Sequence, residues 1–276
     1  MLSFFRKVQG AYFGLEDGKS MENIITLSKL KKEVISEDGT QKTILEDIDL
    51  SVKKGEFICI VGPSGCGKSV LLSILGGIEK GSSGTISFMG NDCSRKMTKE
   101  QKKEISYVFQ QDYLLAWRNV YKNVRLPLEI MKIRKDERIK VMEALTQVGL
   151  EKYADCYPKE LSGGMRQRVG IARALVKDAE LMLLDQPFGA LDAITRKTLA
   201  YQLLNICHET EKSVIMITNQ VEEALLLANR ICVMSSLPGK IIHEIEVPFN
   251  YEEKTGDLSA NTEYLQLKQE LESYVK

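Results

Sequence analysis

One stretch of the chain, residues 57–69, constrains the fold more than any other. Residues 57–61 are nearly all apolar and too few for a helix, which predicts a strand buried inside a parallel sheet. Residues 62–69 read Gly-Pro-Ser-Gly-Cys-Gly-Lys-Ser and match G-x-x-x-x-G-K-[ST] at every fixed position. Apolar residues at helical spacing follow directly. Strand, glycine loop and helix in this order are typical of an α/β fold with a phosphate-binding loop.

The residue types in this loop suit phosphate binding. Glycine lets the backbone curl until successive N–H groups point at one anion, and the helix N-terminus adds positive potential. We expect Lys68 to reach the β- and γ-phosphates and the Ser69 hydroxyl to ligate Mg²⁺. The alternative is a glycine-rich turn that binds nothing, which the flanking strand and helix disfavour. The predicted nucleotide contacts are Gly62, Pro63, Ser64, Gly65, Cys66, Gly67, Lys68, Ser69 and Val70.

Composition excludes several classes of protein. The 276 residues are 43% hydrophobic and 28% charged, as in a globular protein with one large domain or two small ones. Lys plus Arg and Asp plus Glu both number 38, so net charge does not favour a nucleic acid or an anionic membrane surface as partner. The six cysteines form no CxxC pair, which indicates a reducing compartment without disulfides or a zinc site. No apolar run approaches the ~20 residues of a membrane span.

Short apolar runs predict a sheet with helices between its strands. Helical periodicity dominates residues 117–175, where we expect Pro127 and Pro158 to interrupt the helices. Residues 251–276 are charged and carry a loose apolar stripe, which predicts a surface helix or a frayed tail. Further helices are predicted at about 192–207 and 221–228. The predicted strands are residues 24–30, 44–52, 57–61, 85–88, 105–109, 181–185, 214–218, 231–234 and 241–247.

Two later stretches have sequences that suit a role in the same phosphate-binding site. Residues 161–165 read Leu-Ser-Gly-Gly-Met before an apolar helix, with Ser162 as a good N-cap and two glycines that open the helix N-terminus to an anion. A glycine pair alone is weak evidence. Residues 181–185 then form an apolar run that ends in Asp185, the pattern that holds Mg²⁺ opposite a phosphate loop. Taken alone, Asp185 would be a helix cap or a turn residue, but the upstream phosphate loop favours the metal role.

In this order, the stretches resemble the nucleotide-binding subunit of an ABC transporter over about residues 23–248. A phosphate loop alone indicates only the broad NTPase class. The Leu-Ser-Gly-Gly sequence at residues 161–164, about twenty residues before Asp185, specifies this family. Residues 110–117 look like the segment found in nitrate, sulfonate and taurine importer ATPases. The matching motifs are Walker A at residues 62–69, the Q-loop glutamine Gln110, the signature at residues 161–165, the Walker B aspartate Asp185 and the D-loop Ala190-Leu191-Asp192.

The resemblance implies a P-loop NTPase fold with a RecA-like core and a helical signature subdomain. Two such subunits face head to tail, so that each ATP lies between one chain's Walker A and the Ser162, Gly163 and Gly164 of the other. One phosphate loop leaves the γ-phosphate half uncovered, which agrees with that geometry. The implied boundaries are 1–22 for an N-terminal extension, 23–248 for the ABC nucleotide-binding domain, about 112–175 within it for the helical subdomain, and 249–276 for a C-terminal tail.

The resemblance also implies ligands and partners. ATP and Mg²⁺ would be the cofactors, with Ser69, Gln110 and Asp185 as metal ligands and Gln110 also close to the nucleotide. The partners would be a separate transmembrane permease, a second ABC ATPase that is either the same chain or a different one, and an extracytoplasmic substrate-binding protein, without nucleic acid. Because we find no membrane span in the sequence, we expect a peripheral subunit at the cytoplasmic face of the cell membrane.

Three departures from the family pattern matter for catalysis. The family has a glutamate after the Walker B aspartate, and here Gln186 can hydrogen-bond a water without accepting its proton. The family has a histidine near the γ-phosphate, and here Asn219 stands in its place, followed by Gln220 instead of aspartate. The adenine-stacking aromatic should fall near residues 34–35, which are Val and Ile. The three changes within the two catalytic segments, at Gln186, Asn219 and Gln220, favour natural divergence over one engineered ATP-trapping substitution. The predicted catalytic residues are Lys68, Gln186 and Asn219.

Three hypotheses about function stay open. The first is a working transport ATPase in which Gln186 orients the attacking water, because phosphoryl transfer depends mostly on positioning and charge stabilisation. The second is an ATP-binding subunit with impaired hydrolysis that lends its signature to a competent partner. The third is a soluble ABC-type ATPase of translation or DNA repair, which one cassette without a long coiled-coil insertion disfavours. A cassette not fused to a membrane domain favours an importer over an exporter.

Overall fold

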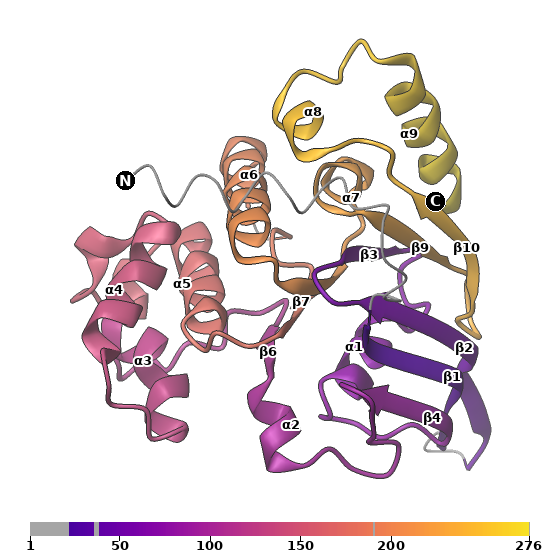
Figure 1. Ribbon diagram of the computed structural model, residues 1–276, viewed down its shortest axis with the longest axis horizontal. Coiled ribbons are helices and arrows are strands. Elements are labelled where there is room, and N and C mark those ends of the chain that lie inside the picture. Colours follow the sequence, from indigo (N-terminus) through magenta and orange to yellow (C-terminus); the bar gives the residue numbers. More distant parts are fainter. Residues whose placement is uncertain (1–21, 36–38, 190, 276) are drawn as a thin grey trace.

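A computed structural model describes residues 22–35, 39–189 and 191–275. Two sheets and the helices around them form two lobes, with the sheets in one and α3, α4 and α5 in the other (Figure 1). The predicted N-terminal extension lies outside the described residues except for Glu22, and so does Ala190 of the predicted D-loop. The α/β fold class expected from the sequence is confirmed.

Strand β3 (Phe57–Val61) belongs to the larger, six-stranded sheet and is buried along its whole length. Its odd-numbered residues face one apolar core and its even-numbered residues face the other, which is why the run lacks polar alternation. The strand order is β10-β9-β3-β8-β7-β6, and β10 alone runs antiparallel to its neighbour. The predicted strands are confirmed to within one or two residues. They are β6 (Ile105–Val108), β7 (Leu181–Asp185), β8 (Ser213–Ile217), β9 (Arg230–Met234) and β10 (Ile241–Glu246).

A smaller antiparallel sheet covers α1 (Lys68–Leu75), the helix that follows the phosphate loop. Leu71 and Leu72 of α1 share one buried cluster with residues of both sheets, so this helix is packed between them. The predicted strands at 24–30, 44–52 and 85–88 are confirmed and are longer than expected. In sheet order, the strands are β2 (Gln41–Lys53), β1 (Asn23–Ile35), β4 (Ser83–Phe88) and β5 (Asn91–Asp92).

The helical lobe contains one departure from the predicted pattern. Pro127 lies inside α3 (Val120–Ile130), so the expectation that it interrupts the helix is wrong. The fixed φ of proline is compatible with a helix. Its missing N–H costs only one backbone hydrogen bond, close to the end of the helix, so α3 continues through it. Pro158 does separate helices, as predicted, at the start of the 3₁₀ turn η2 (Pro158–Glu160). The other elements of the lobe are α4 (Glu137–Gln147), η1 (Glu151–Tyr153) and α5 (Gly163–Leu175).

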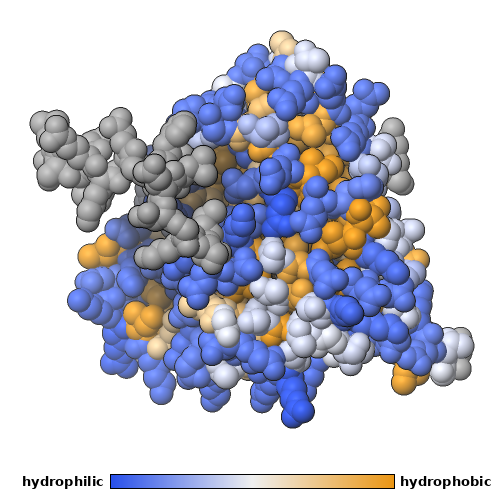
Figure 2. Space-filling model, turned by 45° about the vertical axis from the view of Figure 1, so that its right-hand side comes forward, coloured by the Kyte–Doolittle hydropathy of each residue, from blue (hydrophilic) through white to orange (hydrophobic). Residues whose placement is uncertain are grey.

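The C-terminal helices lie over the large sheet and beside α7 (Figure 1). Leu271 of α9 is fully buried and Leu265 is half exposed, so residues 262–275 form a surface helix docked on the core and not a frayed tail. Figure 2 shows apolar side chains gathered beneath this end of the molecule, with a hydrophilic rim. The helices of this side are α6 (Ala193–Thr210), α7 (Val221–Leu227), α8 (Tyr251–Thr255) and α9 (Thr262–Val275).

Helix α2 (Lys99–Lys103) escapes sequence analysis because it has no apolar face. Thr98 and Gln101 form a capping box that begins this short charged helix instead. Across the ranges that the structure describes, no helix has the length and apolar content needed to cross a membrane.

Candidate nucleotide-binding site

The loop between β3 and α1 has a backbone that only glycine adopts without strain. Gly62, Gly65 and Gly67 all have positive φ, of 151°, 81° and 102°. A Cβ on Gly62 would lie 2.5 Å from the carbonyl oxygen of Met234, so any side chain there collides with the neighbouring strand β9. Gly67 occupies the N-cap of α1 without a side-chain cap, which leaves the first N–H groups of that helix available to an anion.

Lys68 is almost fully buried within this loop, with an exposed fraction of 5%. Its Nζ donates hydrogen bonds to the carbonyl oxygens of Gly62, at 2.8 Å, and Pro63, at 2.9 Å, and lies 3.7 Å from Cys66 Sγ. The loop therefore keeps the ammonium charge at its own centre, where an anion bound by the backbone N–H groups would meet it.

Ser69 and Asp185 meet across the two parts of the predicted site. The Ser69 hydroxyl donates a hydrogen bond to Asp185 Oδ1 at 3.2 Å. Burial raises the pKa of Asp185, while the Ser69 hydroxyl and the Lys68 charge lower it. A hydroxyl and a buried carboxylate side by side supply the oxygen ligands that Mg²⁺ prefers, so these residues fit the metal expected here.

Gln110 follows β6 at the same edge of the sheet. Val108 pairs with Leu184 in the parallel ladder, so the chain leaves β6 and β7 on the side where Asp185 lies. Gln110 itself is exposed, two residues beyond the end of β6.

Gln186 and Asn219 are brought together at the ends of neighbouring strands β7 and β8. The Gln186 N–H donates to the carbonyl oxygen of Ile217 at 3.0 Å, and Asn219 Nδ2 donates to Gln186 Oε1 at 3.3 Å. Asn219 Oδ1 is buried and accepts no hydrogen bond from the described residues. This amide pair, which the sequence pattern could not reveal, offers N–H donors and a buried acceptor but no group that titrates near neutral pH.

The signature segment lies in the other lobe. Ser162 is the N-cap of α5, as predicted, and its hydroxyl accepts a hydrogen bond from the Met165 N–H at 3.3 Å. Figure 1 shows α5 beside α3 and α4 and away from α1, so this chain does not bring Ser162, Gly163 and Gly164 to its own phosphate loop. Ser162 and Gly163 are exposed, and the helix N-terminus that they begin is therefore open to a ligand from outside the chain.

The segment after Gln110 is only partly exposed. Tyr113 and Trp117 are 60% and 74% exposed, whereas Leu114 packs against the main core and Leu115 is half-buried. Sequence analysis missed the contacts that hold this segment to α5. Arg166 Nε donates to Asp112 Oδ2 at 2.9 Å, and Arg173 donates to the carbonyl oxygens of Tyr113, at 3.0 Å, and Asp112, at 2.8 Å. The ion pair joins the residues after Gln110 directly to the signature helix.

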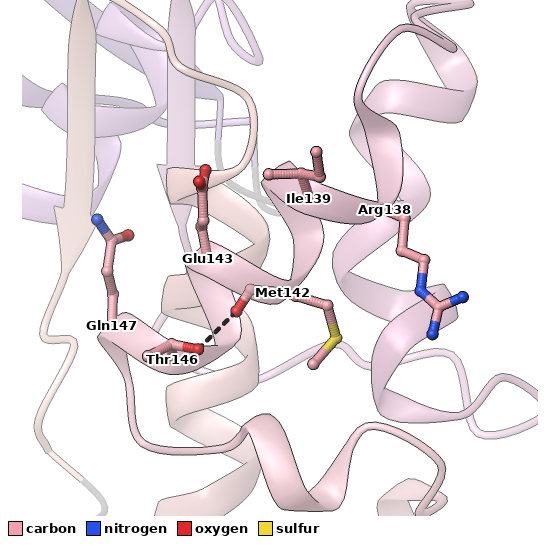
Figure 3. Close-up of a pocket in the computed structure, with 6 residues that line it drawn as sticks. All are labelled: Arg138, Ile139, Met142, Glu143, Thr146 and Gln147. Atoms are coloured by element: carbon pink, nitrogen blue, oxygen red, sulfur yellow. Dashed lines mark hydrogen bonds between the residues drawn. The ribbon is translucent and has the colours of Figure 1, made fainter.

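A hollow of about 600 Å³ lies on α4 (Figure 3), in the lobe away from α1 and the phosphate loop (Figure 1). Its residues come from one helix, and the hydrogen bond among them, from Thr146 Oγ1 to the Met142 carbonyl, stabilises only that helix. It is therefore not part of the candidate site. The lining residues are Arg138, Ile139, Met142, Glu143, Thr146 and Gln147.

Comparison with known proteins agrees with this geometry. The model of the family described as ABC transporter matches residues 45–189. The aliphatic sulfonates import ATP-binding protein SsuB of Bacillus cereus is 41% identical over 82% of this chain and 87% of its own length. The taurine import ATP-binding protein TauB of Pseudomonas aeruginosa is 39% identical over 89% of this chain and 95% of its own.

Among solved structures, the dimeric post-hydrolysis state of the ATP-binding cassette MJ0796 bound to ADP and phosphate superimposes with a TM-score of 0.74. It is 31% identical, and the match covers 82% of this chain and all of that one. The family match contains the phosphate loop, the signature and Asp185. The chain belongs to the ABC transporter family.

Proposed function

We propose that this chain is the ATP-binding subunit of an ABC importer and binds MgATP in the site formed by the phosphate loop and the end of β7. The hydrogen bond between Ser69 and Asp185 carries this proposal, because it places a hydroxyl and a buried carboxylate beside Lys68 at one edge of the sheet. The import proteins for sulfonates and taurine to which the chain is similar support the class of transporter.

Each residue of the site has a separate role in this proposal. Backbone N–H groups of residues 62–70 surround the phosphates and Lys68 contacts the β- and γ-phosphates. Ser69, Asp185 and Gln110 hold Mg²⁺, which, when bound, neutralises charge on the phosphate oxygens. Gln186 and Asn219 lie where the γ-phosphate ends, with N–H groups that donate to its oxygens.

A second cassette completes the site. The exposed N-terminus of α5 at Ser162, Gly163 and Gly164 covers a nucleotide bound to another chain, and the signature of that chain covers the nucleotide here. The dimeric cassette that the chain resembles in structure supports this arrangement. ATP then contributes to the interface between the two subunits.

The remaining partners are a transmembrane permease and an extracytoplasmic substrate-binding protein, with this subunit peripheral at the cytoplasmic membrane face. Exposed Tyr113 and Trp117, held to α5 through Asp112, form a surface suited to the permease. Photo-crosslinkers at residues 112–120 should capture the permease in the purified complex. Capture only from distant surfaces would contradict this docking.

The amide pair of Gln186 and Asn219 favours a second candidate function, an ATP-holding subunit with impaired hydrolysis. Neither amide accepts a proton from water, and the hydrogen bond from Asn219 occupies the Gln186 Oε1 acceptor. In this alternative the intact signature serves a competent partner that carries glutamate and histidine at these positions.

Nucleotide binding is tested with Lys68→Ala. Removing a buried cation that faces several phosphate charges should weaken MgATP binding at least about tenfold in calorimetry. Lys54→Ala is the matched control, because Lys54 is 64% exposed and forms an ion pair with Glu180 on the surface. Equal affinity of the Lys68→Ala protein and the unmodified chain would refute the assigned site.

The two candidate functions are separated by restoring the catalytic groups. Gln186→Glu combined with Asn219→His should raise the ATPase rate of the purified chain by ~10²–10⁴-fold if hydrolysis is impaired by the missing proton acceptor. Both single variants serve as controls. A chain that already turns over at the rate of ordinary transport ATPases, with no gain on restoration, supports the first candidate and rejects the second.

A further inference from the structure

Glu223 of α7 is a buried carboxylate to which the proposed ATP chemistry assigns no role. Its side chain is 8% exposed. Burial raises its pKa, and the Thr218 hydroxyl and the Arg196 charge oppose that shift. The Thr218 hydroxyl donates to Glu223 Oε2, and Arg196 Nε lies 3.6 Å from Glu223 Oε1. The carboxylate therefore joins two segments that come from different parts of the chain.

The first segment contains Asn219. Thr218 is 2% exposed, and its hydroxyl both donates to Glu223 and accepts a hydrogen bond from the Gln220 N–H at 3.0 Å. These two bonds close a turn with Asn219 inside it. The turn fixes the direction in which the Asn219 side chain leaves the backbone, and hence its approach to Gln186.

The second segment is the start of α6. Arg196 Nη2 donates to the carbonyl oxygen of Leu191 at 2.9 Å. The Arg196 N–H donates to the carbonyl oxygen of Asp192, also at 2.9 Å, and Asp192 caps the helix. One guanidinium thus touches Leu191 with one nitrogen and faces Glu223 with another, which the single ammonium of lysine cannot reproduce.

We propose that Glu223 and Arg196 are positioning residues that brace the Thr218–Asn219–Gln220 turn against the Leu191–Asp192 segment. Helices α6 and α7 lie side by side above the sheet, and this pair is the ionic contact between them among the residues described (Figure 1). Loss of Arg196 leaves the buried Glu223 carboxylate uncompensated, and loss of the Glu223 charge leaves Arg196, whose side chain is 28% exposed, without its ionic partner. Either loss loosens both segments together. The effect on ATP rests on the proposed function, while the link between the two segments does not.

The test is hydrogen–deuterium exchange of the full chain, resolved by peptide. Glu223→Gln keeps the size of the side chain and removes its charge, and Arg196→Lys keeps the charge and removes the fork. Because a charge-assisted contact is lost, each variant should speed exchange about tenfold in the segment that does not carry the substitution. That segment is residues 191–196 for Glu223→Gln and residues 217–222 for Arg196→Lys. In each segment, the double variant should show the same increase in exchange rate as the single variant that affects that segment.

Glu222→Gln is the control, since Glu222 is the preceding residue and pairs on the surface with Lys268 of α9 at 2.7 Å. It should leave both segments unchanged. Exchange that rises only around the substituted residue, does not rise, or rises uniformly over the chain would overturn the brace.

A second measurement separates this inference from the proposed function. MgATP should add protection to residues 217–222 in the unmodified chain and in Glu222→Gln, and not in Glu223→Gln, whose affinity for MgATP stays within about twofold because the phosphate loop is untouched. A Glu223→Gln protein that gains the same protection from MgATP would contradict the brace. Absence of MgATP binding by the unmodified chain would reject the proposed function. The hydrogen–deuterium exchange of the two segments without nucleotide would still test whether Glu223 and Arg196 link them.

Discussion

Lys254 gives the sharpest prediction about stability. This residue of α8 is 4% exposed, and its Nζ donates to the carbonyl oxygen of Ala228 at the end of α7. No carboxylate of the described residues forms an ion pair with it. Burial lowers the pKa of Lys254 from its ordinary value of 10.5 to about 8, with a smaller opposing effect from Cys59.

The lowered pKa fixes both the sign and the size of the effect. Between pH 8 and 10.5 the unfolded chain binds the Lys254 proton more tightly than the folded chain does, so stability rises with pH through that window. The full difference between the pKa of Lys254 in the folded and unfolded chains corresponds to at most about 3.4 kcal/mol of unfolding free energy. Between pH 7 and 9, the free energy of unfolding should rise by about 1.3 kcal/mol, which corresponds to a rise of about 3 °C in Tm.

The assay compares thermal unfolding of the unmodified chain with that of Lys254→Met at pH 7, 8 and 9. Methionine keeps the length of the side chain and removes the charge, so the advantage of the variant should shrink by about 1.3 kcal/mol over this range. Lys268→Met is the control, because that side chain is 31% exposed and its pKa is raised by Glu222. A difference between the unmodified chain and Lys254→Met that does not change with pH would refute the reasoning.

Three further outcomes are expected. Gly62→Ala should abolish MgATP binding and lower Tm, because its Cβ would lie 2.5 Å from the Met234 carbonyl; normal binding by calorimetry would contradict the loop geometry. Asp185→Asn should remove the Mg²⁺ dependence of ATP affinity and spare metal-free binding, measured in the presence and absence of Mg²⁺, whereas retained dependence would exclude Asp185 as a metal ligand. Leu271→Ala should cost about 2–5 kcal/mol in chemical denaturation, and a loss under about 1 kcal/mol would mean that α9 is not docked.

Local pattern was sufficient for the sheet and for the phosphate loop. The apolar run at β3 has no polar alternation because both faces are covered, and that property is visible in five consecutive residues. The same holds for β7 and for the N-cap at Ser162, whose chemistry lies within one turn of the residue itself. Where neighbours in sequence decide the structure, the sequence predicts it.

Contacts between distant segments were not predictable in this way. Asn219 is hydrogen-bonded to Gln186 because β7 and β8 are adjacent in the sheet, and nothing near either residue indicates that order. Arg196 and Glu223 are separated along the chain by most of α6 and by β8. Pro127 was misjudged for a related reason, since burial of its neighbour Leu128 against the core holds α3 together.

Binding and turnover depend on different parts of this site. The groups that we propose to hold MgATP are the loop backbone, Lys68, Ser69 and Asp185, all fixed by β3, α1 and β7. The groups that would activate water are at the turn after β8 and at the residue after Asp185, and both are amides here. Because the two sets are held by separate hydrogen bonds, one can change without disturbing the other. A chain with this geometry can keep the affinity of its family for nucleotide while its rate of hydrolysis falls, so the restored double variant should gain turnover without a matching change in affinity.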